Sequence, residues 1–386
     1  MEKVLLVSAR FGSEASGWYL TDDLARALTG AGARVLAVGY GSTATHHRAA
    51  DGSLERLILP LRKRPRYVKY LLAWPHLFLA VRRLSGRNPD ITRIVFFAPL
   101  LVLWPALLAL RSHPCRSRTC IIFDIFPQHH AEIGAIPRWA ARVLRLTEAW
   151  LLRGFSVITG MSPANISAIR RVYGQSVVGK RVEILPPWGA KRTSVKRRPR
   201  GADAPDATSP IRFVFGGQLC KGRDLALGLH FLSLLRARGL RVTLSVFTDR
   251  ASAARLREHC QANPWIEVHD ALPRPEYLLA LTTFDIGFVV TDPTVTLPTF
   301  PSKIVDYISA RLPCLCLLEK ASDLDVVLPY PSIIHTNRFA FDEASLEAAS
   351  SFIARRDDSV EGDFEAAERA LSVERALEVL LERVWA

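Results

Sequence analysis

The chain alternates short apolar strands with helices in two series, and a polar segment separates the two series. Residues 191–210 form that segment, which is rich in Pro and strongly basic in its first half, as linkers often are. The first series opens with a strand at 3–9 and a helix at 20–28, and the second with a strand at 212–215 and a helix at 225–235. Successive β-α-β units form parallel sheets with right-handed crossovers. The sequence therefore predicts an α/β protein of two doubly wound, Rossmann-like domains.

Composition limits the kinds of partner that the chain can bind. Its net charge is +14, with 49% apolar and 23% charged residues, so a globular protein that attracts anions is expected. Nucleotide phosphates, acidic lipid headgroups and nucleic acid all meet that description. The sequence has no zinc-finger spacing and no aromatic-basic signature of an RNA-recognition sheet, so no nucleic acid partner is expected. The six cysteines show no paired metal-binding spacing, which is typical of reduced thiols in a cytosol.

Two apolar stretches bear on the location of the protein. The apolar strand that begins at Lys3 is too short for the core of a signal peptide, so no export is expected. Ile94–Leu110 lies between Arg93 and Arg111 and contains two prolines, which makes it short and doubly interrupted for a membrane span. A buried strand at 94–98 followed by a core helix is expected there instead.

The stretch Arg62–Leu84 gathers Lys and Arg at both ends of an apolar middle that holds Tyr70, Trp74 and Phe78. Aromatic side chains suit the headgroup region of a bilayer, and basic side chains suit its phosphates. A core helix with basic ends is the alternative, and Pro75 would bend either helix. We expect the stretch to hold a cytoplasmic protein on the anionic inner face of the cell membrane, as a peripheral membrane protein.

The segment Thr299–Leu315 is predicted to be a loop, a short helix and a strand, with the helix stopped by Pro313. Pro301, Ser302 and Lys303 precede or open the helix, and Asp306 lies one turn further on. Backbone N–H groups, the positive end of the helix dipole and a mobile ammonium together suit a phosphate, and a carboxylate can accept hydrogen bonds from a ribose diol. Ordinary helix capping by Ser and a solvated Asp are the alternatives.

Two glycine-bearing turns follow predicted strands, where doubly wound sheets bind their ligands. In the second series the pair Gly216–Gly217 leads into Gln218 and Lys221, and such a turn can cradle a phosphate. In the first series the pair Ser16–Gly17 lies in the loop after the first strand. A plain tight turn is the alternative for that loop.

A third strand end carries titratable groups. After the predicted strand at 119–123 the chain holds Asp124, His129, His130 and Glu132. Imidazole and carboxylate groups at the carboxyl end of a strand are candidates for a general base. Adjacent histidines do not project together as an i, i+4 pair does, so no metal site is expected.

These segments resemble the family 4-like glycosyltransferases of the GT-B fold, in particular the branch that builds sugar polymers. The family motif commonly runs Pro-Ser-Lys, about two residues, Glu-Tyr, small residues, Gly, one residue and Pro-Val. Pro301, Ser302 and Lys303 match it, Asp306 stands at the Glu, and Arg311 stands at the Gly. Asp306 is one methylene shorter than Glu, and Arg311 is bulky where backbone freedom is usual.

The resemblance extends over nearly the whole chain. In the turn after Gly217, Gln218 and Lys221 match the family's turn that contacts the donor diphosphate, and Leu272 falls in a segment whose backbone contacts the nucleotide base. Ser16–Gly17 is similar to the family's turn near the donor phosphates. Further matching positions are Asp124, Phe126, Pro127, Gly134, Glu148–Arg153, Ser162–Pro163 and Glu183–Trp188, with Gln128 in place of the family's Glu.

The resemblance implies a nucleotide-sugar-dependent glycosyltransferase whose two domains face each other across a cleft. Residues 1–190 would bind the acceptor, and residues 191–210 would link the domains. Residues 211–365 would bind a UDP- or GDP-sugar, and residues 366–386 would form a helix that crosses back to the first domain. The implied role is bacterial surface polysaccharide synthesis, on a saccharide acceptor linked to polyprenyl diphosphate.

The resemblance also implies a division of roles within the site. Lys221 and Lys303 would neutralise the leaving diphosphate as negative charge builds on it in the transition state, so that no metal is required. Asp306 would hold the ribose. The family retains the anomeric configuration, with the leaving phosphate accepting the proton of the acceptor. An inverting reaction would need a base from the titratable group that follows residue 123.

Three other functions fit the same residues. The first is a glycosyltransferase that acts on a soluble small-molecule acceptor. The second is a GT-B nucleotide-sugar epimerase, which would be active without an acceptor. The third is a basic membrane-surface scaffold, which would bind lipid but no nucleotide.

Overall fold

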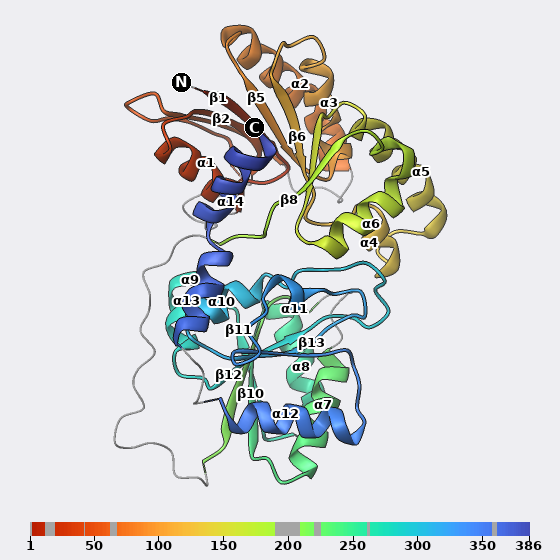
Figure 1. Ribbon diagram of the computed structural model, residues 1–386, viewed down its shortest axis with the longest axis vertical. Coiled ribbons are helices and arrows are strands. Elements are labelled where there is room, and N and C mark those ends of the chain that lie inside the picture. The colour runs from red at the N-terminus through yellow and green to blue at the C-terminus, as the bar shows by residue number, and fades with distance from the viewer. Residues whose placement is uncertain are drawn as a thin grey trace. The chain divides into compact units, whose positions relative to one another are not determined.

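The structure is a computed structural model that describes residues 2–11, 20–41, 43–61, 68–189, 209–219, 225–260, 263–356 and 361–386. The chain divides into two compact units (Figure 1). The first holds Met1–Ala131, Ile136–Ala190 and Ser372–Ala386, and the second holds Glu132–Ala135 and Lys191–Leu371. Most of the expected linker, residues 191–208, lies outside the described residues, as do the calls on Ser16 and Gly17.

The described part of the first unit contains one sheet of eight strands. They are β1 (Lys3–Ser8), β2 (Arg34–Gly41), β3 (Thr45–Arg48), β4 (Leu54–Pro60), β5 (Arg93–Phe97), β6 (Ser117–Ile121), β7 (Val157–Gly160) and β8 (Arg181–Ile184). Their order is β3-β4-β2-β1-β5-β6-β7-β8, and all neighbours are parallel except the antiparallel edge pair β3 and β4. Val4 pairs with Val35 on one side and with Arg93 on the other, so the chain winds outward in both directions from β1.

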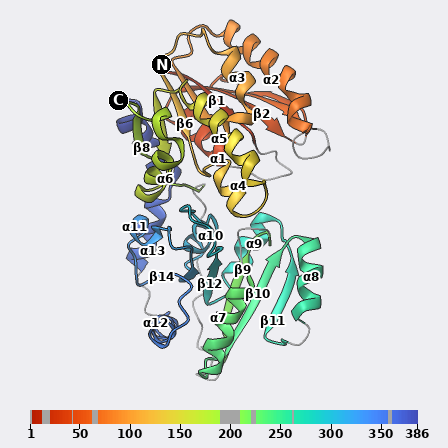
Figure 2. The ribbon, with the colours of Figure 1, turned by 90° about the vertical axis from the view of Figure 1, so that its right-hand side faces the viewer.

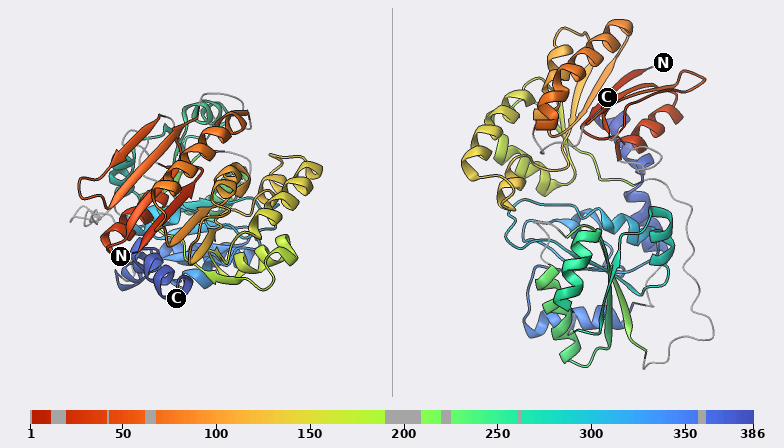
Figure 3. Two further views of the ribbon diagram at one scale, coloured as in Figure 1. Left: turned by 90° about the horizontal axis from the view of Figure 1, so that it is seen from above. Right: turned by 180° about the vertical axis from the view of Figure 1, so that it is seen from behind.

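Helices cover both faces of this sheet. They are α1 (Leu20–Gly30), α2 (Val68–Arg87), η1 (Leu100–Val102), α3 (Trp104–Ala109), α4 (Gln128–Glu132), α5 (Arg138–Leu152), α6 (Pro163–Tyr173), η2 (Gly174–Ser176), α14 (Val373–Val379) and η3 (Leu380–Val384). Alternate residues of a strand point to opposite faces, and Val4 and Leu6 pack with α1 and α14 in one core cluster. Seen from above in Figure 3, α2 lies on the opposite face of the sheet from α14.

The second unit is a parallel sheet covered in the same way. Its strands are β9 (Ile211–Gly216), β10 (Val242–Thr248), β11 (Ile266–Asp270), β12 (Ile286–Val290), β13 (Cys314–Leu317) and β14 (Ile334–Asn337), in the order β11-β10-β9-β12-β13-β14. Its helices are α7 (Leu225–Ala237), α8 (Arg250–Cys260), α9 (Arg274–Leu281), α10 (Lys303–Ser309), α11 (Leu324–Val327), α12 (Glu343–Ala354) and α13 (Glu361–Ala370), some of which Figure 2 shows beside the strands. One core cluster joins α7 and α12 to the sheet, and another joins α9, α10 and α13 to it. Both sheets confirm the predicted fold class.

The suspected membrane span is part of the core of the first unit. Residues 94–97 are buried in β5, and the following turn η1 and helix α3 complete the stretch, as predicted. Within the described ranges, the structure holds no helix with the length and apolar character needed to cross a bilayer. Of the basic, aromatic stretch Arg62–Leu84, residues 62–67 lie outside the described residues and the remainder belongs to α2, which contains Pro75.

The C-terminal segment forms the two helices α13 and α14, whereas one helix is expected over residues 366–386. α13 ends at Ala370, and α14 begins after Ser372, whose hydroxyl accepts a hydrogen bond from the N–H of Arg375 at 3.1 Å. Ser372 has extended backbone and forms a β-bridge with Gly189. A helix cannot continue through such a residue, and Ser there caps the next helix. The prediction of one continuous helix is therefore wrong.

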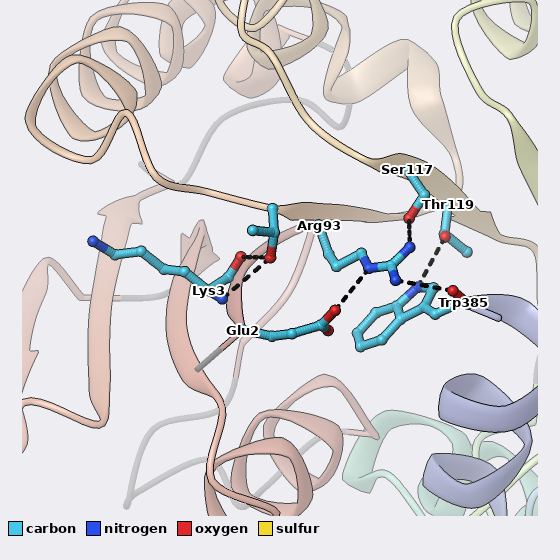
Figure 4. A network of polar contacts seen from close by, with 7 residues as sticks. Glu2, Lys3, Arg93, Ser117, Thr119 and Trp385 are labelled. Carbon is cyan, nitrogen blue, oxygen red and sulfur yellow. Dashed lines mark hydrogen bonds and ion pairs between the residues drawn. The ribbon is translucent and has the colours of Figure 1, made fainter.

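Trp385 fixes the end of the chain to the first unit (Figure 4). Its indole N–H donates to Thr119 Oγ1 at 3.3 Å, and its carbonyl accepts from Arg93 Nη2 at 2.9 Å. The Arg93 guanidinium lies 5.5 Å from the centre of the indole ring and also donates to Ser117 Oγ and Glu2 Oε1. The buried Trp385 therefore combines apolar packing and a cation–π contact of its ring with one hydrogen bond from the indole and one to its backbone carbonyl. This is the physical basis for the return of the C-terminal helix to the first unit.

Helix α10 ends at Ser309, well before Pro313, so the expectation that Pro313 stops it is wrong. Arg311 adopts a left-handed backbone with φ of 58°, which a helix cannot contain. Its guanidinium donates to Glu368 of α13 at 3.0 Å and to Glu361 at 2.6 Å. Arg311 thus has a backbone conformation that Gly adopts more readily, and its side chain joins the end of α10 to α13.

Replacement of Arg311 should separate these two effects. Arg311→Ala removes both ion pairs and keeps a side chain in the left-handed region, so we expect a loss of about 1 to 3 kcal/mol in the free energy of unfolding. Arg311→Gly loses the same pairs but relieves the backbone, so it should be more stable than the Ala variant by about 1 kcal/mol. Urea unfolding of the three proteins measures both differences. An Ala variant as stable as the Gly variant would contradict the left-handed backbone.

Candidate functional site

The residues predicted to bind a donor nucleotide gather at one edge of the second sheet, where the parallel strands have their carboxyl ends. Gly217 and the exposed Gln218 follow β9, and the exposed Leu272 follows β11. Pro301–Ser302 lies in the segment between β12 and α10. Ligands of doubly wound sheets bind at such an edge. Lys221 lies outside the described residues.

Tyr307 of α10 joins two parts of this edge. Its hydroxyl accepts a hydrogen bond from Gly216 N at 3.0 Å and donates toward Val214 O at 3.3 Å. Burial raises the pKa of Tyr307, so the phenol stays neutral. A Cβ at Gly287 would lie 2.4 Å from the Tyr307 ring, and a Cβ at Gly216 would lie 1.8 Å from the hydroxyl oxygen of Tyr277. These two glycines, Gly216 at the end of β9 and Gly287 near the start of β12, therefore let α9 and α10 approach the strands closely.

Lys303 lies between a buried carboxylate and an aromatic ring. Its Nζ is 3.6 Å from Asp306 Oδ2 and 5.2 Å from the centre of the Tyr277 ring. The Lys303 side chain is 31% exposed, whereas that of Asp306 is 4% exposed. Both neighbours attract a cation. Burial, together with the negative charge of Asp306, raises the pKa of Tyr277, so that ring stays neutral. Lys303 therefore presents a partly exposed ammonium at this edge of the sheet.

Ser302 does not act as a conventional cap of α10. Its backbone is helical, and its hydroxyl makes no capping hydrogen bond to that helix. Ordinary capping, which the sequence left open as an alternative, is therefore not observed.

Glu319 is a buried carboxylate at this edge that sequence reasoning missed. It follows β13, and its Oε1 accepts hydrogen bonds from Thr299 N at 2.7 Å and Thr299 Oγ1 at 2.9 Å. Its own N–H donates to Thr291 Oγ1 at 2.8 Å. Glu319 thereby fixes the loop that leads to Pro301. The available signal was an acidic residue directly after an apolar strand, the same signal that singled out Asp124.

The candidate base residues of the first series lie around α4. Asp124 is exposed in the segment after β6, and Glu132 ends α4. His129 and His130 are half-buried on α4, with ring centres 6.0 Å apart and ring planes at 89°. Across the part of the chain that the structure describes, no group of three or more His, Cys, Asp and Glu side chains is placed to hold a metal ion.

Comparisons with known proteins find likeness in structure but not in sequence. No family model matches the chain, and no curated protein matches it. Sucrose-phosphate synthase from Thermosynechococcus elongatus superposes with a TM-score of 0.68 at 14% identity, over 100% of this chain and 99% of its own. HepE of Anabaena, in complex with UDP-glucose, gives a TM-score of 0.62 at 12% identity over 100% of this chain and 99% of its own. The lipopolysaccharide outer core galactosyltransferase WaaB gives 0.59 at 9% identity, over 98% and 99%.

Likeness at these identities shows the fold. This chain has two doubly wound α/β units and superposes on these proteins over nearly its whole length and theirs. The chain therefore has the GT-B fold, as the resemblance implied.

Proposed function

We propose that the chain is a glycosyltransferase that takes a sugar from a nucleoside diphosphate sugar bound at the carboxyl edge of the second sheet. The observation that carries this proposal is the Lys303 ammonium beside Asp306 and the Tyr277 ring, at the start of α10. In HepE, which shares the fold over its full length, the bound ligand is UDP-glucose. A UDP- or GDP-sugar is the donor that we propose here.

In the proposed reaction the cations of the second unit act on the leaving group. Lys303 and Lys221 stabilise the diphosphate as its charge increases, which lowers the barrier because the contact strengthens in the transition state. Asp306 accepts hydrogen bonds from the ribose, while Gly217 and Gln218 contact the phosphates and Leu272 lies beside the base. Ser16 and Gly17 of the first series complete the phosphate contacts. The reaction retains the anomeric configuration and needs no metal, because the lysines supply the positive charge.

The proposed acceptor is a saccharide linked to polyprenyl diphosphate, bound by the first unit at an anionic membrane surface during surface polysaccharide synthesis. The basic, aromatic stretch Arg62–Leu84 supports this part of the proposal, because it lies in the first unit and carries many cations. Asp124, His129, His130 and Glu132 would orient the acceptor or, if the reaction inverts, supply the base.

A ligand screen tests the proposal as a whole. We expect UDP or GDP to raise the melting temperature of the protein, because a ligand that binds only the native state stabilises it. Transfer from the matching nucleotide sugar should require an acceptor. Conversion of the sugar without any acceptor would indicate an epimerase instead. If no nucleoside diphosphate raised the melting temperature, the proposed donor site would be refuted.

Removal of the site lysines should weaken donor binding. We expect Lys303→Ala and Lys221→Ala each to weaken nucleoside diphosphate binding or to lower kcat by about 1 to 3 kcal/mol, the range for a charge-assisted contact. Isothermal titration and initial rates measure these changes. Arg241→Ala is the matched control, since this exposed cation precedes β10 at the amino edge of the same sheet. Unchanged affinity and turnover in both lysine variants would refute the assignment.

Asp306→Asn tests the ribose contact separately from the sugar. The amide keeps the size of the side chain but loses the charge that accepts from two hydroxyls, so binding of the nucleotide and of the nucleotide sugar should weaken alike. Binding of both ligands to one preparation is compared by titration. A loss confined to the sugar-bearing ligand would move Asp306 from the ribose to the transferred sugar.

Charge removal in the basic stretch tests the membrane part of the function. Replacement of Arg62, Lys63, Arg64, Arg66 and Lys69 by Gln should release the protein from anionic vesicles, since each cation near such a surface contributes about 1 kcal/mol. Nucleotide binding should be unaffected, because the donor site lies in the other unit. Equal transfer to a soluble and a lipid-linked acceptor would instead favour a small-molecule acceptor.

A further inference from the structure

Helix α5 carries an exposed apolar stripe, which we call the α5 stripe. It consists of Trp139, Val143, Leu146 and Trp150, whose side chains are 73%, 59%, 64% and 65% exposed. The spacing of four, three and four residues places them on one face of the helix. Large apolar side chains grouped in this way on a protein surface mark a site of interaction.

The opposite face of α5 is buried in the first unit. Ala141, Glu148, Leu151 and Leu152 are its buried residues, and α5 packs against η1 and α6. The α5 stripe is therefore not the face by which α5 packs on the core. It is a second apolar face, on a helix that is already packed through its opposite face.

The surroundings of the α5 stripe are basic. Arg138, Arg142 and Arg153 are exposed on or next to α5, and the one carboxylate of the helix, Glu148, is buried. Helix α6, which packs against α5, contains no Asp or Glu, and neither do α2 and α3. These helices thus combine exposed apolar side chains with nearby cations and have no exposed carboxylate. Such a surface is complementary to a lipid bilayer with anionic headgroups.

The outer helices of the first unit share this character. Of the fifteen large apolar side chains that are exposed in the described part of the chain, nine lie on α2, α3 and α5. α2 packs against α3, and α5 packs against η1 at the start of α3, so the three helices form one continuous layer, part of which Figure 2 shows. The apolar exposure of the molecule is thus concentrated in this layer rather than scattered.

We infer that the α5 stripe is a membrane-binding surface that lies in the headgroup region of an anionic bilayer, in addition to the basic stretch at the start of α2. The inference extends the proposed function by assigning a second membrane contact to the acceptor-binding unit. Trp139 and Trp150 stand about 16 Å apart along the helix axis, which suits a helix lying flat at the interface. Indole rings prefer that depth, with their apolar body toward the acyl chains and the N–H toward the headgroups.

A second copy of the chain is the less suitable occupant of this face. An isologous contact would bring Arg138, Arg142 and Arg153 of one copy close to the same residues of the other, with no exposed carboxylate on α5 to offset their repulsion. An anionic lipid surface meets the apolar and the cationic side chains at once.

Vesicle binding of the full chain tests the inference. Sedimentation with vesicles of phosphatidylcholine and phosphatidylglycerol should show that Trp139→Ser/Trp150→Ser lowers the partition coefficient at least about tenfold, because two large apolar side chains are lost. The matched control is Leu279→Ser/Val326→Ser in the second unit, two exposed apolar side chains outside the stripe, which should partition as the unaltered protein does. Vesicles of phosphatidylcholine alone should bind all of these proteins more weakly.

A second measurement reports insertion directly. Lipids brominated on their acyl chains should quench the fluorescence of the unaltered protein more than that of Trp139→Phe/Trp150→Phe, which keeps apolar rings and should still bind. Partition of the Ser variant equal to that of the unaltered protein, or equal quenching of the Phe variant, overturns the inference. A dimer in solution that the Ser variant abolishes, without vesicle binding, would make the stripe an interface between copies.

The outcome is separable from that of the proposed function. A thermal shift with UDP or GDP, measured on the same preparations, shows that each variant is folded and reports the donor site alone. Nucleotide binding without vesicle binding that depends on the α5 stripe would refute this inference but not the glycosyltransferase proposal. Stripe-dependent vesicle binding without nucleotide binding would refute the glycosyltransferase proposal but not this inference.

Discussion

The hydrogen bond between the N–H of Gly216 and the hydroxyl of Tyr307 fixes the geometry on which the proposed donor site depends. α10 is only seven residues long, too short to be stable through its own hydrogen bonds, so tertiary contacts must hold it. Tyr307 holds its middle, Glu319 holds the loop before it through Thr299, and Arg311 holds the residues after it on α13. The positions of Lys303 and Asp306 follow from these three anchors.

The charges at this edge are arranged so that the ammonium remains available. A buried carboxylate is costly unless other groups compensate it, and Glu319 is compensated at Oε1 by the N–H and hydroxyl of Thr299, while its buried Oε2 has no hydrogen-bond partner among the residues that the structure describes. Asp306 has Lys303 nearby, but the distance of 3.6 Å is longer than a direct hydrogen bond. Lys303 therefore gains from the negative charge of Asp306 without a direct hydrogen bond to it. A partly exposed ammonium in that position can turn toward a phosphate.

Much of the fold could be predicted from the sequence, because parallel strands buried on both faces leave continuous apolar runs between helices. β3 and the break at Ser372 could not, since β3 is polar and exposed and a Ser inside a helical pattern is ambiguous until Gly189 pairs with it. In the site, short motifs indicated Lys303 and Asp306. Glu319 was missed because its partner Thr299 is twenty residues away, and the backbone of Arg311 was hidden by a side chain that ordinarily avoids a positive φ. Contacts between residues distant in sequence decided the cases of Ser372, Glu319 and Arg311.

The contacts of the buried face of α5 determine how its exposed face is oriented. On the inner face, both oxygens of Glu148 accept N–H groups from η1, Leu100 at 2.6 Å and Leu101 at 2.9 Å. Burial raises the pKa of Glu148 to about 7, and the two N–H donors act against that rise. A buried carboxyl group stabilises a helix only if its hydrogen-bond partners are fixed in place. Here the partners are the two N–H groups of η1, the turn that precedes α3. The orientation of the α5 stripe is therefore set by polar contacts within the layer of α2, α3 and α5, so a surface that docks on the stripe meets a rigid helix rather than one that must first be ordered.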